Sequence, residues 1–274
     1  MELGKNLLPE DYVEPTCPLC MNADAVKRIP LQRVAEKLDE YMGRQDFAAA
    51  RRHLTYWLAE AESCGDRRGM FGVHSEWMGF CRKMGEGEDA ISHAKAAMAL
   101  LDEVGAESVA AATIYINAAT VYQAFSQPTA ALPLFEHAKA IYHRELSPTD
   151  DRVGGLYNNM ALTLVSLGHY GEAYELYKKA LEIMAHAENG ALEQAITYLN
   201  MANAVEVEHG LEKAEAKISQ YLDKAADLLD TPSLPRNGYY AFVCEKCAPT
   251  FDYYGFFLYA NDLKERAREI YERP

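Results

Sequence analysis

Apolar residues recur along most of the chain at the spacing of an α-helix. In GHYGEAYELYKKALEIM (168–184), the residues Tyr170, Ala173, Tyr177, Ala180 and Met184 fall on one helical face. No stretch shows the sustained alternation of polar and apolar residues that marks a half-buried strand. The pattern therefore predicts an all-α protein.

The helical pattern repeats. Three segments carry the signature Y-x-N-x-A and begin 42 and 41 residues apart; they are YINAATVYQAF from Tyr115, YNNMALTLVSLG from Tyr157 and YLNMANAVEVEHG from Tyr198. After each segment comes a turn and then an alanine that opens a second helical run. With fainter copies included, these alanines are Ala50, Ala90, Ala131, Ala173, Ala214 and Ala260, at intervals of 40, 41, 42, 41 and 46 residues. Each unit is thus predicted to be a pair of helices, here called helix A and helix B.

The repeat predicts a solenoid of about six antiparallel helix pairs, because one pair cannot bury its apolar face alone. SPTDDR, with its Ser, Thr and Asp, predicts a helix start near Asp151. We place an N-terminal arm at 1–28 and the solenoid at 29–274. The expected units are 29–64, 66–104, 106–147, 149–188, 190–230 and 236–273.

These segments resemble the tetratricopeptide repeat. Its pattern of a small residue in helix A, a Gly turn, an aromatic and A-x3-F/Y-x2-A in helix B is matched in 157–184, and ALPLFEHAKAIY (131–142) fits the second half. At 40 to 42 residues the units are similar to the longer repeats of kinesin light chains and bacterial peptide-sensing receptors. The resemblance implies a right-handed α-solenoid that binds a protein or peptide partner in its concave groove, without enzymatic activity.

The composition of the chain limits the classes of partner and function that are expected. The net charge is −14, from 41 acidic and 27 basic residues, which disfavours binding to nucleic acid or to an anionic membrane. The six cysteines are too sparse for a disulfide scaffold, and we read no targeting signal, so a cytoplasmic location is expected. No nucleophile–base constellation is apparent among the eight histidines and their neighbours, so we expect neither catalysis nor a cofactor.

The asparagine ladder is the main candidate site. Asn117, Asn159 and Asn200 recur at 42 and 41 residues, and on the resemblance they lie on helix A and face the groove. A side-chain amide both donates and accepts, so it can bind the backbone of an extended peptide. The alternative is that these residues bridge neighbouring helices. By the same register, the further predicted groove residues are Asn158, Asn203, Thr120, Gln123, Glu206 and Lys246.

Two C-x-x-C pairs raise a second possibility. Cys17 and Cys20, with Cys244 and Cys247, offer four thiolates to zinc, as a metal-stabilised structural module. The repeat frame opposes this, because it makes Cys244 and Cys247 packing positions of the last helix A and places the two pairs at opposite ends of the solenoid. A dinucleotide-like GEGEDA (85–90) falls, in the same frame, in the A-to-B turn of the second unit.

Nine aromatic residues crowd into the last unit. Tyr and Phe occupy positions 239, 240, 242, 251, 253, 254, 256, 257 and 259. They are expected to cap the end of the core; the alternative is a self-association surface. For the whole chain, the favoured function is a scaffold that binds a protein or peptide. The alternative of another class is a sensor for a small signalling peptide.

Overall fold

The computed structural model describes residues 28–104 and 107–272, and over these residues it contains twelve α-helices and no strand. The all-α prediction is therefore confirmed. In chain order the helices are α1 (Leu31–Gly43), α2 (Phe47–Cys64), α3 (Arg67–Met84), α4 (Gly87–Val104), α5 (Val109–Ala124), α6 (Pro128–Glu145), α7 (Asp151–Ser166), α8 (Tyr170–Met184), α9 (Gly190–His209), α10 (Leu211–Leu229), α11 (Gly238–Tyr253) and α12 (Phe257–Tyr271).

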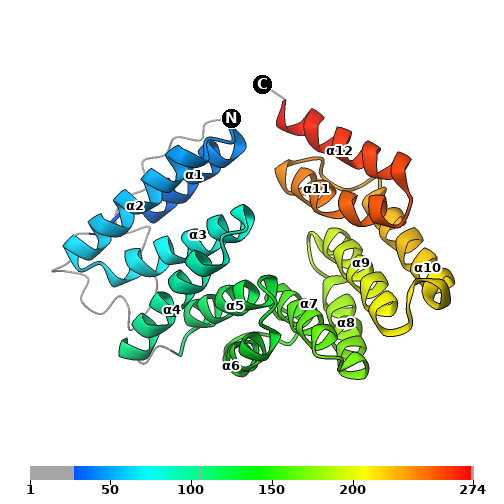
Figure 1. Ribbon diagram of the computed structural model, residues 1–274, viewed down its shortest axis with the longest axis horizontal. Helices are drawn as coiled ribbons and strands as arrows, with labels where there is room; N and C mark the ends of the chain where they lie inside the picture. Colours follow the sequence, from blue (N-terminus) through cyan, green and yellow to red (C-terminus); the bar gives the residue numbers. More distant parts are fainter. Residues whose placement is uncertain (1–27, 105–106, 273–274) are drawn as a thin grey trace. The chain divides into compact units, whose positions relative to one another are not determined.

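The chain divides into two compact units, residues 1–127 and 128–274. The described helices α1 to α5 belong to unit 1, and α6 to α12 belong to unit 2. Within each unit the helices follow one another in space in the order of the chain (Figure 1). Each odd-numbered helix, the helix A of its pair, also packs on the next helix A of its unit, as α3 does on α5 and α7 on α9.

Side-chain caps fix several helix starts. Asp46, Asp66, Ser108 and Asn237 each accept a hydrogen bond from the backbone N–H three residues later, as expected for N-caps. Asp150 caps α7, which begins at Asp151 as the SPTDDR segment predicted.

The A-to-B turns share one backbone feature. In each of the six turns a residue adopts a left-handed φ between 56° and 87°, and these residues are Gln45, Gly85, Ser126, Gly168, Gly210 and Gly255. Their spacing of 40 to 45 residues reproduces the sequence repeat. The GEGEDA segment is one of these turns, as predicted, because Gly85 ends α3 and α4 begins at Gly87.

Alanines at the repeat positions form the close helix contacts. Ala50, Ala90, Ala131, Ala173, Ala214 and Ala260 are all at most 1% exposed. A larger side chain at such a position would overpack the contact between helices. The alanine series found in the sequence thus lies in the buried contacts between helices.

No described helix is long and apolar enough to cross a membrane.

Candidate functional site

Two asparagines of the ladder bridge neighbouring A helices. Asn117 of α5 donates from Nδ2 to the Ser75 hydroxyl of α3, at 2.7 Å. Asn200 of α9 donates in the same way to Oδ1 of Asn158 on α7, at 3.1 Å. Both bonds span 42 residues, one more than the 41-residue repeat, so each joins a ladder asparagine to the residue just before the equivalent position of the preceding unit. The bridging role weighed in the sequence analysis is thus present in both units.

The bridge leaves most of each amide available. An asparagine amide has two N–H donors and an acceptor oxygen. Asn117 and Asn200 each use one donor, and their Oδ1 atoms accept no hydrogen bond from the described residues. The Asn159 side chain, half-buried on α7, makes no hydrogen bond to any described residue. The bridges therefore orient two amides, while the third has no hydrogen-bond partner among the described residues.

The other predicted groove residues differ in surroundings. Asn158 is only 8% exposed. Thr120 is half-buried, and its hydroxyl donates to the Ile116 carbonyl of its own helix at 2.8 Å. Gln123 is half-buried, and Lys246 is exposed on α11. Their assignment to partner binding stays a prediction.

Two of the predicted groove residues accept hydrogen bonds from tyrosines at the C-terminal end of α11. The Tyr254 hydroxyl donates to Asn203 Oδ1 at 2.9 Å and lies 2.7 Å from Glu206 Oε2. The Tyr253 hydroxyl donates to Glu206 Oε1 at 2.7 Å. Sequence reasoning placed these tyrosines in an aromatic cap and did not anticipate that they would hold polar residues of the preceding unit.

The last-unit aromatics separate into a buried and an exposed set. Tyr240 and Phe251 are fully buried in the core of α9 to α12. Phe242, Tyr253, Phe256 and Phe257 are exposed. The cluster thus contributes to the core, as expected of a cap, and self-association through its exposed members stays a prediction.

Cys244 and Cys247 are core residues. Both are at most 1% exposed and pack in the core of α9 to α12, as the repeat frame predicted. Burial raises the pKa of the Cys244 thiol to about 11 and that of Cys247 to about 12, which disfavours the thiolate needed for zinc. Cys17 and Cys20 lie outside the described residues.

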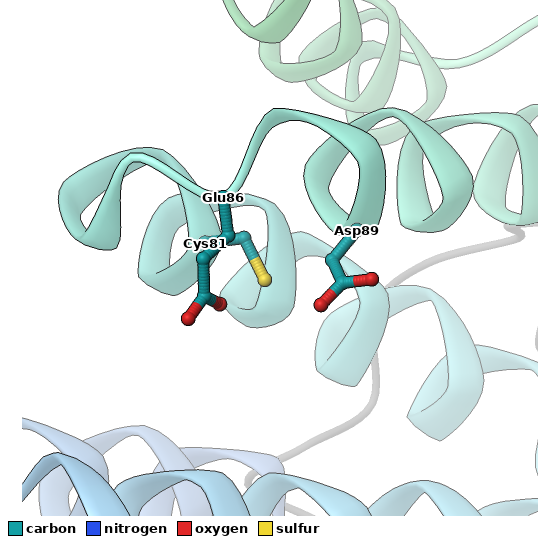
Figure 2. A group of neighbouring side chains, drawn as sticks. All are labelled: Cys81, Glu86 and Asp89. Atoms are coloured by element: carbon teal, nitrogen blue, oxygen red, sulfur yellow. The ribbon is translucent and has the colours of Figure 1, made fainter.

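One further group has the donor atoms for a cation. Cys81 lies in the last turn of α3, Glu86 lies in the turn that follows and Asp89 lies at the start of α4. Ligand atoms of all three fall within 4.8 Å of one another (Figure 2). The Arg51 guanidinium forms ion pairs with both carboxylates. Burial, with Glu86 and Asp89, raises the pKa of the Cys81 thiol to about 12. A protonated thiol beside two carboxylates that share one guanidinium fits an internal ion-pair cluster better than a metal centre.

A pair of histidines joins the same two helices, α3 and α4. His74 of α3 and His93 of α4 approach with their Nδ1 atoms 2.9 Å apart, and His93 stacks on Trp77 with ring centroids 4.8 Å apart. Burial, and after it His93, lowers the pKa of His74 to about 4; burial also lowers the pKa of His93. The two histidines are 19 residues apart in the sequence and lie on the two helices of one pair. No local sequence pattern therefore predicts their contact.

Comparison with known proteins agrees with this helical-repeat architecture. Family models of the tetratricopeptide repeat match residues 75–144 and 153–189. These two stretches therefore carry tetratricopeptide repeats within an all-α helical-repeat fold, as the sequence resemblance indicated, and this repeat class indicates a protein-interaction scaffold. No curated protein matches the chain in sequence.

Solved structures with a similar fold are remote in sequence. BtubC (BKLC) from P. vanneervenii is 18% identical, with a TM-score of 0.52 over 89% of this chain and 91% of that one. The nearly identical TPR-like repeats of a candidate kinesin light chain from Podosopora anserina are 17% identical, with a TM-score of 0.49 over 72% and 92%. At such identities only the fold of BtubC is informative for this chain.

Proposed function

We propose that this chain is a non-enzymatic scaffold that binds an extended segment of a protein partner along its A helices. Asn159 and Asn200 of unit 2, and separately Asn117 of unit 1, would contact a partner's backbone, and the residues around them would select the partner's side chains.

The availability of the ladder amides is the observation that carries the proposal. A half-buried amide that makes no hydrogen bond to a described residue stays accessible to solvent, and therefore to the backbone of a partner. Asn159 is such a group, and a peptide backbone supplies both the donor and the acceptor that it lacks.

The bridges at Asn117 and Asn200 support the same function. A bond from one N–H fixes the side-chain rotamer, so a partner that binds the remaining oxygen loses less side-chain entropy. The bridging and binding roles are therefore compatible in one residue.

Asn159→Ala is the sharpest test, because it removes no hydrogen bond to a described residue. Tagged chain would recover partners from its native host, and quantitative mass spectrometry would compare wild type with the variant. We expect recovery of the specific partner to fall by about tenfold, the loss of one or two hydrogen bonds at an interface.

Two variants control the experiment. Asn261→Ala removes an exposed asparagine on α12 and should leave recovery unchanged. Ser75→Ala removes only the acceptor of the Asn117 bridge, so it should have a smaller effect than Asn159→Ala. Equal recovery by wild type and Asn159→Ala would rule out a binding role for the ladder.

A further inference from the structure

The turn between α11 and α12, in unit 2, carries a group of exposed apolar side chains. Its four members lie within residues 253–258; they are Tyr253, Phe256, Phe257 and Leu258, here called the α11–α12 tip. Leu258 is 88% exposed, more than any other large apolar side chain of the described residues, and Tyr253 and Phe257 are 67% and 59% exposed. Contiguous apolar surface of this kind marks a surface that contacts another molecule.

The packing of the helix pairs does not require these apolar residues. The residue two before the repeat alanine is Leu258 in the last pair, but in the other pairs it is polar or small: Ala48, Glu88, Thr129, Gly171 and Glu212. The residue four before that alanine is Phe256 in the last pair, but in the other pairs it is polar or glycine: Asp46, Glu86, Gln127, His169 and Gly210. The tip is therefore a feature of the last pair and not of the repeat.

Phe256 also takes the place of a helix cap. It occupies the N-cap position of α12 and makes no side-chain cap hydrogen bond, whereas Asp46 caps α2 at the equivalent position. A polar N-cap side chain accepts a hydrogen bond from a free N–H of the first turn, which phenylalanine cannot do. The tip thus departs from the local preference of a helix start, and such departures are expected where a surface has a function.

The neighbours of the tip pack inward, whereas the tip faces outward. Tyr254 and Tyr259 pack against the core of α9 to α12. The Tyr253 hydroxyl donates to Glu206 at 2.7 Å, and the Tyr253 ring lies edge-on to Tyr254 with centroids 4.9 Å apart. The exposed Tyr253 ring is thereby held in one orientation, which reduces the entropy lost when another surface covers it.

The charges near the tip disfavour several occupants. Asp252, which precedes the tip, is exposed, and the Glu206 carboxylate accepts hydrogen bonds from Tyr253 and Tyr254. In a chain of net charge −14, these carboxylates repel an anionic lipid surface or an acidic protein. The four side chains of the tip carry no charge, so a second copy of the tip covers them without burying an unpaired charge.

The area of the tip is sufficient for a weak dimer. Covering four side chains of this size and exposure removes roughly 500 Å² of accessible surface per copy, or about 1,000 Å² for a pair. Specific interfaces begin at about this size, and the smallest of them are weak, so the expected Kd is roughly 1–100 µM.

We propose that this chain forms a two-fold symmetric dimer through the α11–α12 tip. Phe257 and Leu258 of one copy pack against the same two residues of the other, because a two-fold axis brings the same patch of both copies together. The dimer does not use the asparagine ladder, so it goes beyond the proposed scaffold function. It joins two partner-binding chains, which strengthens binding to a partner that offers two sites.

Sedimentation velocity of the full chain from about 1 to 300 µM tests the proposal. The weight-average sedimentation coefficient should rise with concentration from that of a monomer toward that of a dimer. Phe257→Ser/Leu258→Glu should raise the dimer Kd at least about tenfold, because it removes the centre of the interface and adds a negative charge on each side of it.

A matched double variant controls for the loss of exposed apolar surface. Tyr56→Ser/Tyr271→Glu makes the same kind of change at two exposed aromatic residues outside the tip and should leave the Kd unchanged. Asn159→Ala should also leave it unchanged, which separates the dimer from partner binding. Circular dichroism should show wild-type helix content for each variant.

Photocrosslinking locates the interface without removing it. A benzophenone side chain in place of Leu258 should join two chains covalently under ultraviolet light, with a yield that rises with concentration. The same group in place of Tyr56, in unit 1, should not.

Three results would each overturn the proposal. The first is a wild-type chain that stays monomeric up to about 300 µM. The second is an equal dimer Kd for the tip variant and the matched control variant. The third is a monomeric wild type that floats with phosphatidylcholine vesicles when the tip variant does not, which would assign the tip to a neutral membrane.

Discussion

His74 and His93 form a buried contact that depends on their being neutral. With the Nδ1 atoms 2.9 Å apart, one ring must donate and the other accept, so protonation of both would break the bond. Burial, and after it His93, lowers the pKa of His74 to about 4, below its value of about 6.5 in an unfolded chain. As the pH falls below 6.5 the unfolded chain takes up the proton first, so stability that is complete above pH 6.5 is lost toward pH 4.

Replacing His74 should flatten this pH dependence. Between pH 7 and pH 5 the wild type should lose about 1–2 kcal/mol of unfolding free energy through His74, and His74→Gln should lose less by the same amount. Urea unfolding followed by tryptophan fluorescence measures it, because Trp57 and Trp77, the two tryptophans of the chain, both lie in unit 1. Parallel pH curves for wild type and variant would contradict the prediction.

Residue-level contacts were the least predictable from sequence. The Asn117 and Asn200 bridges could be named only as an alternative, because one repeat position can face either a groove or the neighbouring helix. The histidine pair and the tyrosine bonds to Glu206 join residues 19 to 48 positions apart. Such contacts are set by tertiary packing, which hydrophobic periodicity does not encode.

At the scale of the helix pair, the A-to-B turn is the recurring device. Four of its six left-handed positions are glycine, which tolerates positive φ, and the other two are Gln45 and Ser126. The sequence therefore located the turns marked by Gly85 and Gly168 well. The turns at Gln45 and Ser126 had to be inferred from the alanine intervals, because nothing in their own sequence requires a left-handed residue.

Substituting two glycines that lie three residues apart distinguishes the cost of backbone strain from the cost of steric clash. Gly168 has a φ of +78° and Gly171 lies inside α8; a Cβ at either position would meet no atom within 4 Å. Gly168→Ala should therefore destabilise unit 2 by about 1–2 kcal/mol through φ alone. Gly171→Ala should stabilise it by about 0.5–1 kcal/mol, because alanine restricts the unfolded chain and favours a helix.

Urea unfolding followed by far-UV circular dichroism measures both changes. The two substitutions differ little in packing, since neither added methyl group would make a contact, so a difference in their effects on stability reports the backbone conformation. Equal effects of the two substitutions would show that the left-handed turn carries no conformational requirement.

At the scale of the whole chain, sequence repeat and structural unit do not coincide. The repeat match over 75–144 runs across the junction at Gln127, whereas helix contacts divide the chain between α5 and α6. The all-α class and the repeat were predictable from periodicity, because each pair reuses one packing pattern. The division into two compact units was not, because it depends on how strongly successive pairs pack.

This division predicts unfolding in two steps. In a repeat protein each pair is stabilised mainly by its neighbours, so a weak link along the stack lets the two sides unfold at different urea concentrations. Tryptophan fluorescence reports unit 1, and circular dichroism reports the helices of both units.

Gly168→Ala, in unit 2, should shift a circular dichroism transition and leave the fluorescence midpoint in place. His74→Gln at pH 7 should shift the fluorescence midpoint and leave the other transition unmoved. If Gly168→Ala shifts both probes equally, the chain unfolds as one cooperative body and the two units are not energetically separate.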